Sequence, residues 1–177
     1  MYSVDHRDHV LSLGAVPLPS VGAPLPVVLA TDSHLLLAYL VEVHDPAWDG
    51  TEVRGVDHAT DGEPAALIEF VAPSAHFFGP PNDEAIAGHP LAARGLVSGV
   101  PARVGDSSWI RGLERMNRVH PRHQPERYAR LQHFIFPFHD STFECVAQDL
   151  RVVMHAGSLA ELLPEMQRRV NPRGASI

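Results

Sequence analysis

Alternating phenylalanines between residues 133 and 147 constrain the fold more than any other feature of the sequence. A period of two places alternate side chains on one face of a β-strand. The apolar positions with this period are Phe134, Phe136, Phe138, Phe143, Cys145 and Ala147. A turn centred on Asp140-Ser141 predicts an antiparallel hairpin in which Phe138 lies opposite Phe143. Phe136 then lies opposite Cys145, and every aromatic ring of the hairpin faces the core.

Other segments indicate further strands and several helices. Short runs rich in β-branched and apolar residues predict strands at residues 27–30, 35–43, 65–72 and 76–78. Capping residues and apolar periodicity predict helices at 84–88, 90–96 and 158–170, and a further helix that is capped by residues 106–108 and has Trp109, Leu113 and Met116 on one apolar face. We therefore expect an α+β fold, with a mainly antiparallel sheet of about five to six strands packed against three to four helices.

The chain has 177 residues, no internal repeat and no clear linker. We expect a single domain spanning 1–177, a length that can bury a core. Within it we expect a Pro-rich extended arm at 15–26, an acidic loop at 45–63 and a flexible tail at 171–177.

Two compositional features exclude several function classes. All 14 basic residues are arginine, so no lysine is present for a P-loop nucleotide site or a pyridoxal phosphate Schiff base. Cys145 is the only cysteine, which excludes internal disulfides and iron–sulfur clusters and suits a reducing, cytoplasmic setting. The first nine residues lack the apolar core of a secretory signal. The longest apolar run, residues 35–41, is too short to cross a membrane.

Charge is unevenly distributed along the chain. Residues 1–100 contain 3 arginines against 13 acidic residues, whereas residues 101–130 contain 7 arginines against 3. The overall net charge of −7 argues against general nucleic-acid binding. An acidic first part could instead neutralise a basic protein partner.

The polar face of the predicted hairpin offers candidate catalytic residues. In the register above, His139 lies one diagonal step from Glu144, and Asp140 lies in the turn beside it. A histidine beside a carboxylate can exchange protons with a substrate or bind a metal. We therefore take His139, Glu144 and Asp140 as candidate catalytic residues, the alternative being a solvated strand face with a turn-forming aspartate.

Two histidines follow the predicted central helix. His120 and His123 are three residues apart and could converge on a divalent transition metal, with His139 and Glu144 completing a four-ligand site. The HExxH pattern of zinc proteases is absent. The alternative is a pair of imidazoles that interact with the carboxyl end of a helix.

Candidate ligand-binding residues fall in two groups. Arg111, Arg115 and Arg118 share one face of the predicted helix and could hold a phosphate or carboxylate. The alternative is a solvated face or a contact with acidic loops. Asn82, Asp83 and His89 surround a Pro-Pro turn and a helix start, where they could line a pocket or simply cap the helix.

Together these residues favour a small cytoplasmic domain whose His-, carboxylate- and Arg-lined polar pocket binds or acts on a small anionic molecule, with metal assistance as an option. The first alternative is a non-catalytic protein-interaction domain, of the immunity or regulatory type, that uses its acidic surface. A ligand-binding module without turnover is a third possibility. The catalytic hypothesis requires the polar residues of the hairpin and of the 79–89 segment to converge in one pocket.

Overall fold

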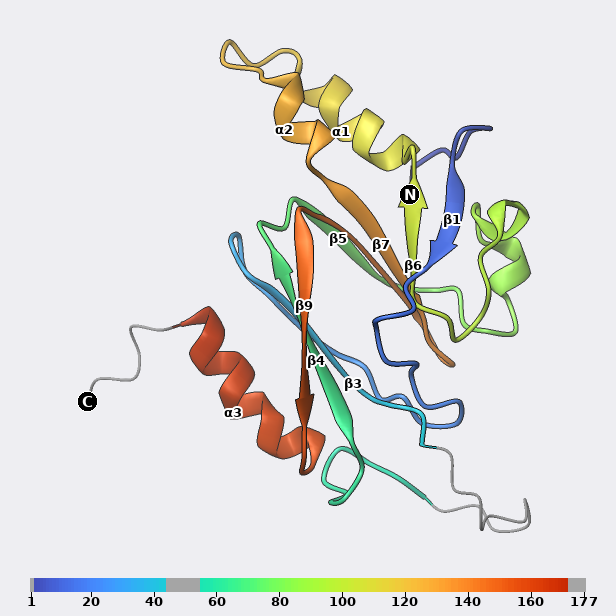
Figure 1. The fold of residues 1–177 in the computed structure, drawn as a ribbon, viewed down its shortest axis with the longest axis vertical. Helices are drawn as coiled ribbons and strands as arrows, with labels where there is room; N and C mark the ends of the chain where they lie inside the picture. Colours follow the sequence, from blue (N-terminus) through green and yellow to red (C-terminus); the bar gives the residue numbers. More distant parts are fainter. Residues whose placement is uncertain (1, 44–54, 172–177) are drawn as a thin grey trace.

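The computed structural model describes residues 2–43 and 55–171, which form two antiparallel sheets flanked by helices (Figure 1). The strands are β1 (His9–Ser12), β2 (Val27–Ala30), β3 (Leu35–Leu40), β4 (Ala65–Val71), β5 (Ala75–Gly79), β6 (Ala102–Gly105), β7 (Gln132–Pro137), β8 (Thr142–Ala147) and β9 (Asp149–His155). The helices are α1 (Ser108–Asn117), α2 (Pro125–Ala129) and α3 (Leu159–Val170), and the 3-10 turns are η1 (Ile86–Gly88) and η2 (Ala92–Arg94).

The first sheet has five strands in the order β1-β6-β7-β8-β5, and the second has four in the order β2-β3-β4-β9. All neighbouring strands are antiparallel. The two sheets pack face to face through a core that includes Tyr39 and Phe70 from one sheet and Phe136 and Phe143 from the other. The rings of Phe70 and Phe136 meet edge to face at 6.0 Å, a favourable geometry for aromatic pairs.

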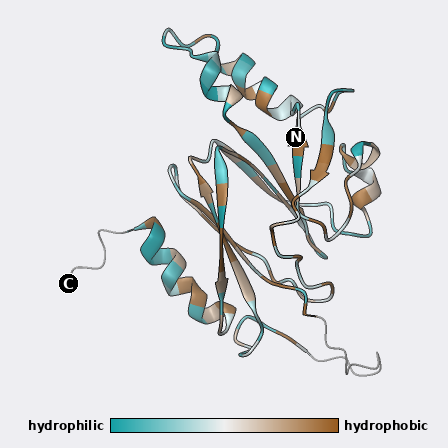
Figure 2. Cartoon of the chain, viewed as in Figure 1, coloured by the Kyte–Doolittle hydropathy of each residue, from teal (hydrophilic) through white to brown (hydrophobic). Residues whose placement is uncertain are grey.

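Each sheet also carries a covering layer on its outer face. On the second sheet, Leu159, Leu162 and Met166 of α3 pack against alternate residues of β3 and β4. As a result every side chain of β3 is buried, which explains its unbroken apolar sequence. On the first sheet, η1, η2 and the N-terminal segment cover β6 and β7. Figure 2 shows hydrophilic residues over much of α1 and α3; α3 buries one apolar face, whereas Ser108 is the only buried residue of α1.

The prediction of one sheet packed against three to four helices is wrong. The structure has nine strands in two antiparallel sheets and only three α-helices among the described residues. The two strands that we missed, β1 and β6, have four residues each and no alternating apolar pattern strong enough to identify them. β8 and β9 follow each other almost directly in the chain but belong to different sheets. The predicted helices at 84–88 and 90–96 are 3-10 turns of three residues each.

The predicted faces of the Phe-rich hairpin are confirmed, but its register is wrong. Phe136 lies opposite Phe143, and Phe134 lies opposite Cys145, a shift of two residues. A shift of two preserves which side chains share a face. The turn is closed by the Phe138 N–H, which donates to the Ser141 carbonyl at 2.7 Å.

The 81–83 segment holds this turn in place. The Thr142 hydroxyl donates to the Pro81 carbonyl at 2.8 Å, and the Asp83 N–H donates to the His139 carbonyl at 2.9 Å. These contacts are remote in sequence, so the hairpin sequence alone does not reveal them.

Residues 15–26 run alongside β3. The Leu40 N–H donates to the Pro24 carbonyl, and Pro19 forms an isolated bridge with Val41. Of the predicted acidic loop at 45–63, residues 45–54 lie outside the described part of the chain, as do residues 172–177 of the predicted tail. Among the described residues, no helix has the length and apolar character that a membrane crossing requires.

Candidate functional site

Glu144 is the centre of a polar cluster on the outer face of the first sheet. Its position in β8 alternates with Phe143 and Cys145, so its side chain points away from the aromatic core, where it is 1 % exposed. Three donors reach its carboxylate: Tyr2 through its hydroxyl at 2.5 Å, His133 through Nε2 at 2.9 Å and His89 through Nε2 at 3.3 Å. They come from the N-terminal segment, from β7 and from the turn before η2.

The backbone fixes the protonation of His89. The Leu91 N–H donates to Nδ1 of His89 at 3.1 Å, so that nitrogen carries no proton. The Nε2 proton of His89 therefore points to Glu144. His89 is a neutral donor with both ring nitrogens in use.

His133 links Glu144 to the start of α1. Its Nε2 lies 2.9 Å from the carboxylate of Glu144, and its Nδ1 lies 2.9 Å from Oγ of Ser107. Ser107 is the N-cap of α1, and its Oγ also accepts the Ile110 N–H at 3.3 Å. This chain of hydrogen bonds connects β8, β7 and α1 across the outer face of the sheet.

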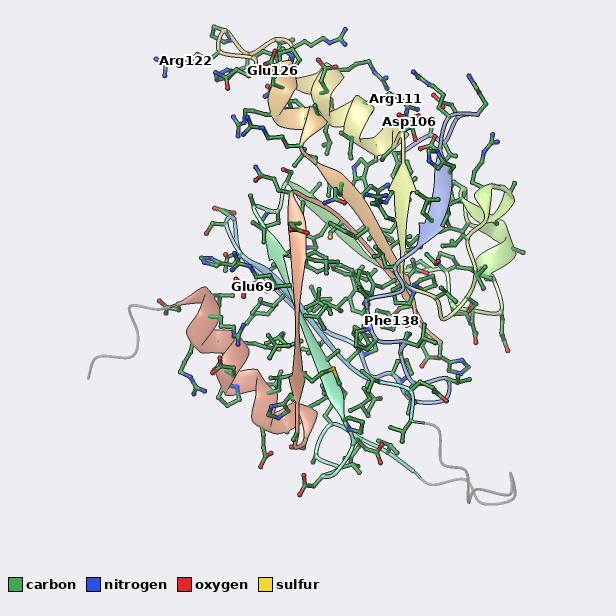
Figure 3. The ribbon with its side chains drawn as sticks, viewed as in Figure 1. Glu69, Asp106, Arg111, Arg122, Glu126 and Phe138 are labelled. Atoms are coloured by element: carbon green, nitrogen blue, oxygen red, sulfur yellow. The ribbon has the colours of Figure 1, made fainter. Side chains whose placement is uncertain are left out.

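Residues 2–8 clamp α1 over the cluster. The ring of Tyr2 stacks on Trp109 with centroids 5.1 Å apart and planes 6° from parallel. The carboxylate of Asp8 accepts the Ser108 N–H at 2.6 Å, where a negative charge favours the amino end of a helix. Arg111 donates to Asp5 at 2.7 Å; Figure 3 labels Arg111 beside Asp106, where β6 leads into α1.

The hydrogen bonds keep Glu144 charged. Burial alone would raise the pKa of Glu144, but hydrogen bonds from His133, His89 and Tyr2 outweigh burial and lower the pKa to about 2. Burial and the neighbouring charge of Glu144 raise the pKa of Tyr2 far above its usual range, so its hydroxyl stays protonated and donates. Glu144 is therefore a fixed negative charge at neutral pH, not a proton donor.

A pocket of about 530 Å³ opens between α1 and the strands β5 and β8. We call it the Trp109 pocket; its walls are Tyr2, Ser3, His76, Phe77, Ser108, Trp109, Gly112, Leu113, Arg115, Met116 and Glu144. Gly112 leaves open space on the helix: a side-chain carbon there would meet only Nη2 of Arg115, at 3.9 Å. The guanidinium of Arg115 therefore lies over Gly112, beside the aromatic wall.

The structure places the predicted catalytic residues in two locations. His139 is exposed and pairs through Nδ1 with the carboxylate of Asp83 at 2.7 Å. Asp140 is exposed, with its carboxylate 4.0 Å from His139. Glu144 instead contacts His133. The two-residue shift of the hairpin places Glu144 opposite Ile135, and His133 is then its diagonal neighbour on β7. The hydrogen bond to Asp83 raises the pKa of His139 above its usual value.

The predicted ligand-binding residues also separate. Arg111 pairs with Asp5, and Arg118 pairs with Glu114 at 2.7 Å. The guanidinium of Arg115 has no hydrogen bond or ion pair among the described residues, and Arg115 lines the Trp109 pocket. The side-chain oxygen Oδ1 of Asn82 accepts the Ala85 N–H at 3.1 Å, a capping contact. His89, by contrast, joins Glu144 in the buried cluster.

The four-ligand metal arrangement does not form. His123 contacts Glu114 at 2.9 Å and Asn117 at 3.0 Å, and Nδ1 of His120 accepts the Arg122 N–H. In the sequence, Arg122 lies between the two histidines and Phe138 precedes His139. Figure 3 shows Arg122 and Phe138 far apart. Within the described ranges, no group of three or more His, Cys, Asp or Glu side chains is arranged to hold a metal ion.

Sequence reasoning missed four members of the cluster: Tyr2, Ser107, Trp109 and His133. For His133 the signal was present, since it shares the polar hairpin face with Glu144. For Ser107 the capping signal was visible but indicated only a helix start. Tyr2 lies 142 residues from Glu144, and no local pattern reveals such a contact.

Comparison with known proteins adds no information on the site: no protein-family model, no curated protein and no solved structure matches this chain.

Proposed function

We propose that this protein binds a small organic acid with a flat or apolar body in the Trp109 pocket. The observation that carries the proposal is the guanidinium of Arg115, which has no partner among residues 2–43 and 55–171 and lies over Gly112 in a pocket of about 530 Å³. A guanidinium without a carboxylate partner favours an anionic group, which it can hold through two parallel hydrogen bonds. Arg111 and Arg118, the neighbours of Arg115 on α1, already pair with carboxylates of the chain itself.

The walls of the pocket support an apolar or aromatic ligand body. Trp109 and Tyr2 stack on each other, and Phe77 and Met116 contribute further apolar surface. Ligand pockets typically combine such walls with a few polar groups that fix orientation. Within the described part of the chain, Oε1 of Glu144 has one partner, His89 at 3.3 Å, so it can accept a hydroxyl or amine proton of the ligand.

The low pKa of Glu144 favours binding of the ligand without proton transfer to or from Glu144. A carboxyl whose pKa lies at about 2 is too weak a base to abstract a proton from an ordinary substrate. The role left for Glu144 is to orient the ligand. A basic protein partner stays a prediction, because it rests on composition alone.

The test is a binding screen with defined aromatic carboxylates, including benzoate, phenylacetate and indole-3-acetate. Ligands that raise the melting temperature are then measured by titration calorimetry against wild-type, R115Q and R122Q proteins. Arg122 is an exposed arginine in the α1–α2 loop, outside the pocket, and controls for the change of charge.

We expect R115Q to weaken binding roughly 10-fold to 100-fold, the range expected for one charge-assisted hydrogen-bonded pair. R122Q should bind like the wild type. Equal weakening by both variants would show only long-range charge attraction and would overturn the proposal. The absence of any binder in the series would overturn it as well.

A further inference from the structure

A carboxylate, an imidazole and a hydroxyl lie in line at the start of α1. Oε2 of Glu144 lies 2.9 Å from Nε2 of His133, and Nδ1 of His133 lies 2.9 Å from Oγ of Ser107. Both distances are ordinary hydrogen bonds. The order is the one used by nucleophilic serines, in which a carboxylate orients an imidazole that accepts the serine proton.

The partners indicate which tautomer a neutral His133 adopts. An ionised carboxylate only accepts, so Nε2 of His133 carries the proton that points to Glu144. A neutral imidazole with its proton on Nε2 has a free lone pair on Nδ1. The Ser107 hydroxyl therefore donates to Nδ1 while its oxygen accepts the Ile110 N–H. This tautomer is the one that lets His133 act as a base.

The position of Ser107 suits a developing negative charge. Asp106, in the left-handed region at φ 47°, turns the chain sharply from β6 into α1, and Ser107 sits at the amino end of this ten-residue helix. The helix dipole stabilises negative charge there, and two of the first-turn N–H groups are already used, that of Ser108 by Asp8 and that of Ile110 by Ser107. The backbone N–H of Trp109 has no hydrogen-bond partner within the described part of the chain, so it can donate to an oxyanion.

Ser107 borders a second pocket, on the side of α1 away from Gly112. This pocket has a volume of about 400 Å³, and Val104, Ile110 and Leu131 give it an apolar wall. The apolar wall can take a short acyl chain, and the polar side consists of Arg111, Tyr128 and the carboxylates of Asp106 and Glu114. We call it the Ser107 pocket.

We propose that Ser107 is the nucleophile of an esterase site, with His133 as the general base and Glu144 as its positioning residue, acting on carboxylic esters with short apolar acyl groups. The two sites share Glu144, but the esterase site requires nothing of Arg115, and Ser107 does not line the Trp109 pocket. R115Q therefore tests the first proposal alone, and S107A tests the second alone.

In the first step, Oγ of Ser107 forms a bond to the ester carbonyl carbon while its proton moves to Nδ1 of His133. The carbonyl π electrons move to the oxygen, which the Trp109 N–H stabilises. When the carbonyl reforms, the bond to the leaving alkoxide breaks, and that oxygen takes the proton from Nδ1. A water molecule then attacks the acyl-serine and gives its proton to Nδ1. The acid leaves as the Ser107 oxygen recovers this proton.

The first experiment treats the full chain with an alkyl fluorophosphonate and locates the adduct by peptide mass mapping. Hydrolysis of p-nitrophenyl butyrate is measured in parallel. The variants are S107A and S158A. Ser158 is a matched control because it is also a buried N-cap serine, of α3, and it bonds Glu161 rather than a histidine. S158A therefore reproduces the loss of a helix cap without touching the site.

We expect one phosphonyl group per chain, on Ser107, and hydrolysis that falls at least 100-fold in S107A but is unchanged in S158A. E144Q should lower kcat with little change in KM, a split that a merely structural role would not produce. No adduct on the folded wild type, an adduct elsewhere, or equal hydrolysis by wild type and S107A would overturn the proposal.

If S107A fails to fold, S107C gives an independent test. The only other cysteine, Cys145, is buried, and burial raises its pKa well above the usual value. Iodoacetamide should then alkylate the native S107C variant at position 107, faster than it alkylates the native wild type at Cys145. Equal alkylation rates in the two proteins would contradict an accessible, activated position.

Discussion

At the scale of single residues, the buried charge of Glu144 sets the energetics of the cluster. A lone carboxylate in this position would be expensive, and three donors compensate for the water that it loses. When the charge is removed, the three donors, which are arranged for an ion, face a weaker acceptor. Breaking a buried charged pair typically costs several kcal/mol.

The variant E144Q tests this balance. The pKa of Glu144 falls from an ordinary 4.5 to about 2 on folding, which corresponds to about 3 kcal/mol of stabilisation at neutral pH. Because the folded-state pKa is the lower one, this contribution is complete above pH 4.5 and is lost as the pH falls toward 2. In urea denaturation at pH 7, we expect E144Q to be less stable by about 3 kcal/mol.

The difference between E144Q and wild type should shrink as denaturation is repeated from pH 4.5 down to pH 3. The control is E126Q, at an exposed glutamate of α2, which should match the wild type throughout. A difference that stays constant down to pH 3 would show that packing, not charge, is responsible.

His139 offers a second prediction, with the opposite sign of pH dependence. The hydrogen bond to Asp83 raises the pKa of His139 above its usual 6.5, so the pair stabilises the fold below that pH and loses its effect as the pH rises through the raised pKa. Titration followed by NMR should give a midpoint for His139 above 6.5, and D83N should return it toward 6.5. An unchanged midpoint in D83N would contradict the pairing.

At the scale of elements, two glycines predict opposite outcomes of the same substitution. Gly112 lies inside α1, where alanine is favoured by up to about 1 kcal/mol and where an added methyl group meets nothing closer than Arg115 at 3.9 Å. Gly157 has φ +130°, and an added methyl group there would collide with the Glu161 carboxylate. By thermal and urea unfolding, we expect G112A to be more stable and G157A less stable than wild type. A loss of stability in G112A would contradict the open space on α1.

The Phe-rich hairpin shows which features of an element can be predicted from its sequence. The period of two determined which side chains share a face, because a strand allows no other arrangement. The register was not determined, because a shift of two residues keeps the same face buried. The structure selects one register through Thr142 and Asp83, which contact partners far away in the sequence. Glu144 consequently faces His133 rather than His139.

The candidate site was predictable to the same extent. The polar face that holds His133 and Glu144 was identified, whereas the residues that complete the cluster, Tyr2 and Ser107, come from remote segments. Of the arginines on α1, the spacing predicted a shared face but could not show which one lacks a carboxylate partner. That distinction depends on Asp5 and Glu114, which the fold brings to the other two.

At the scale of the whole molecule, strand content was underestimated because the first sheet gains two short strands, β1 and β6, through pairing between segments far apart in the sequence. Strands β1 and β6 pair with each other across nearly a hundred residues, and their four-residue lengths give little local signal. Strand β3 is apolar on both faces. One face packs against the first sheet, and α3 covers the other face. A long apolar run is expected both for a strand of a single buried sheet and for a strand that lies between a second sheet and a helix. The sequence does not distinguish these two arrangements.

The shared aromatic core predicts that the two sheets unfold as one cooperative unit. Phe136 of β7 packs on Tyr39 of β3 and on Phe70 of β4, which belong to the other sheet. Replacing Phe136 by alanine removes these contacts and should cost about 3–5 kcal/mol. Because the cavity borders both sheets, amide hydrogen exchange in β3 and in β7 should accelerate by the same factor in F136A. The short edge strand β1 exchanges through local opening and should change little. If F136A accelerated exchange in β7 but left β3 as slow as in the wild type, the sheets would be independent units and the common core would not couple them.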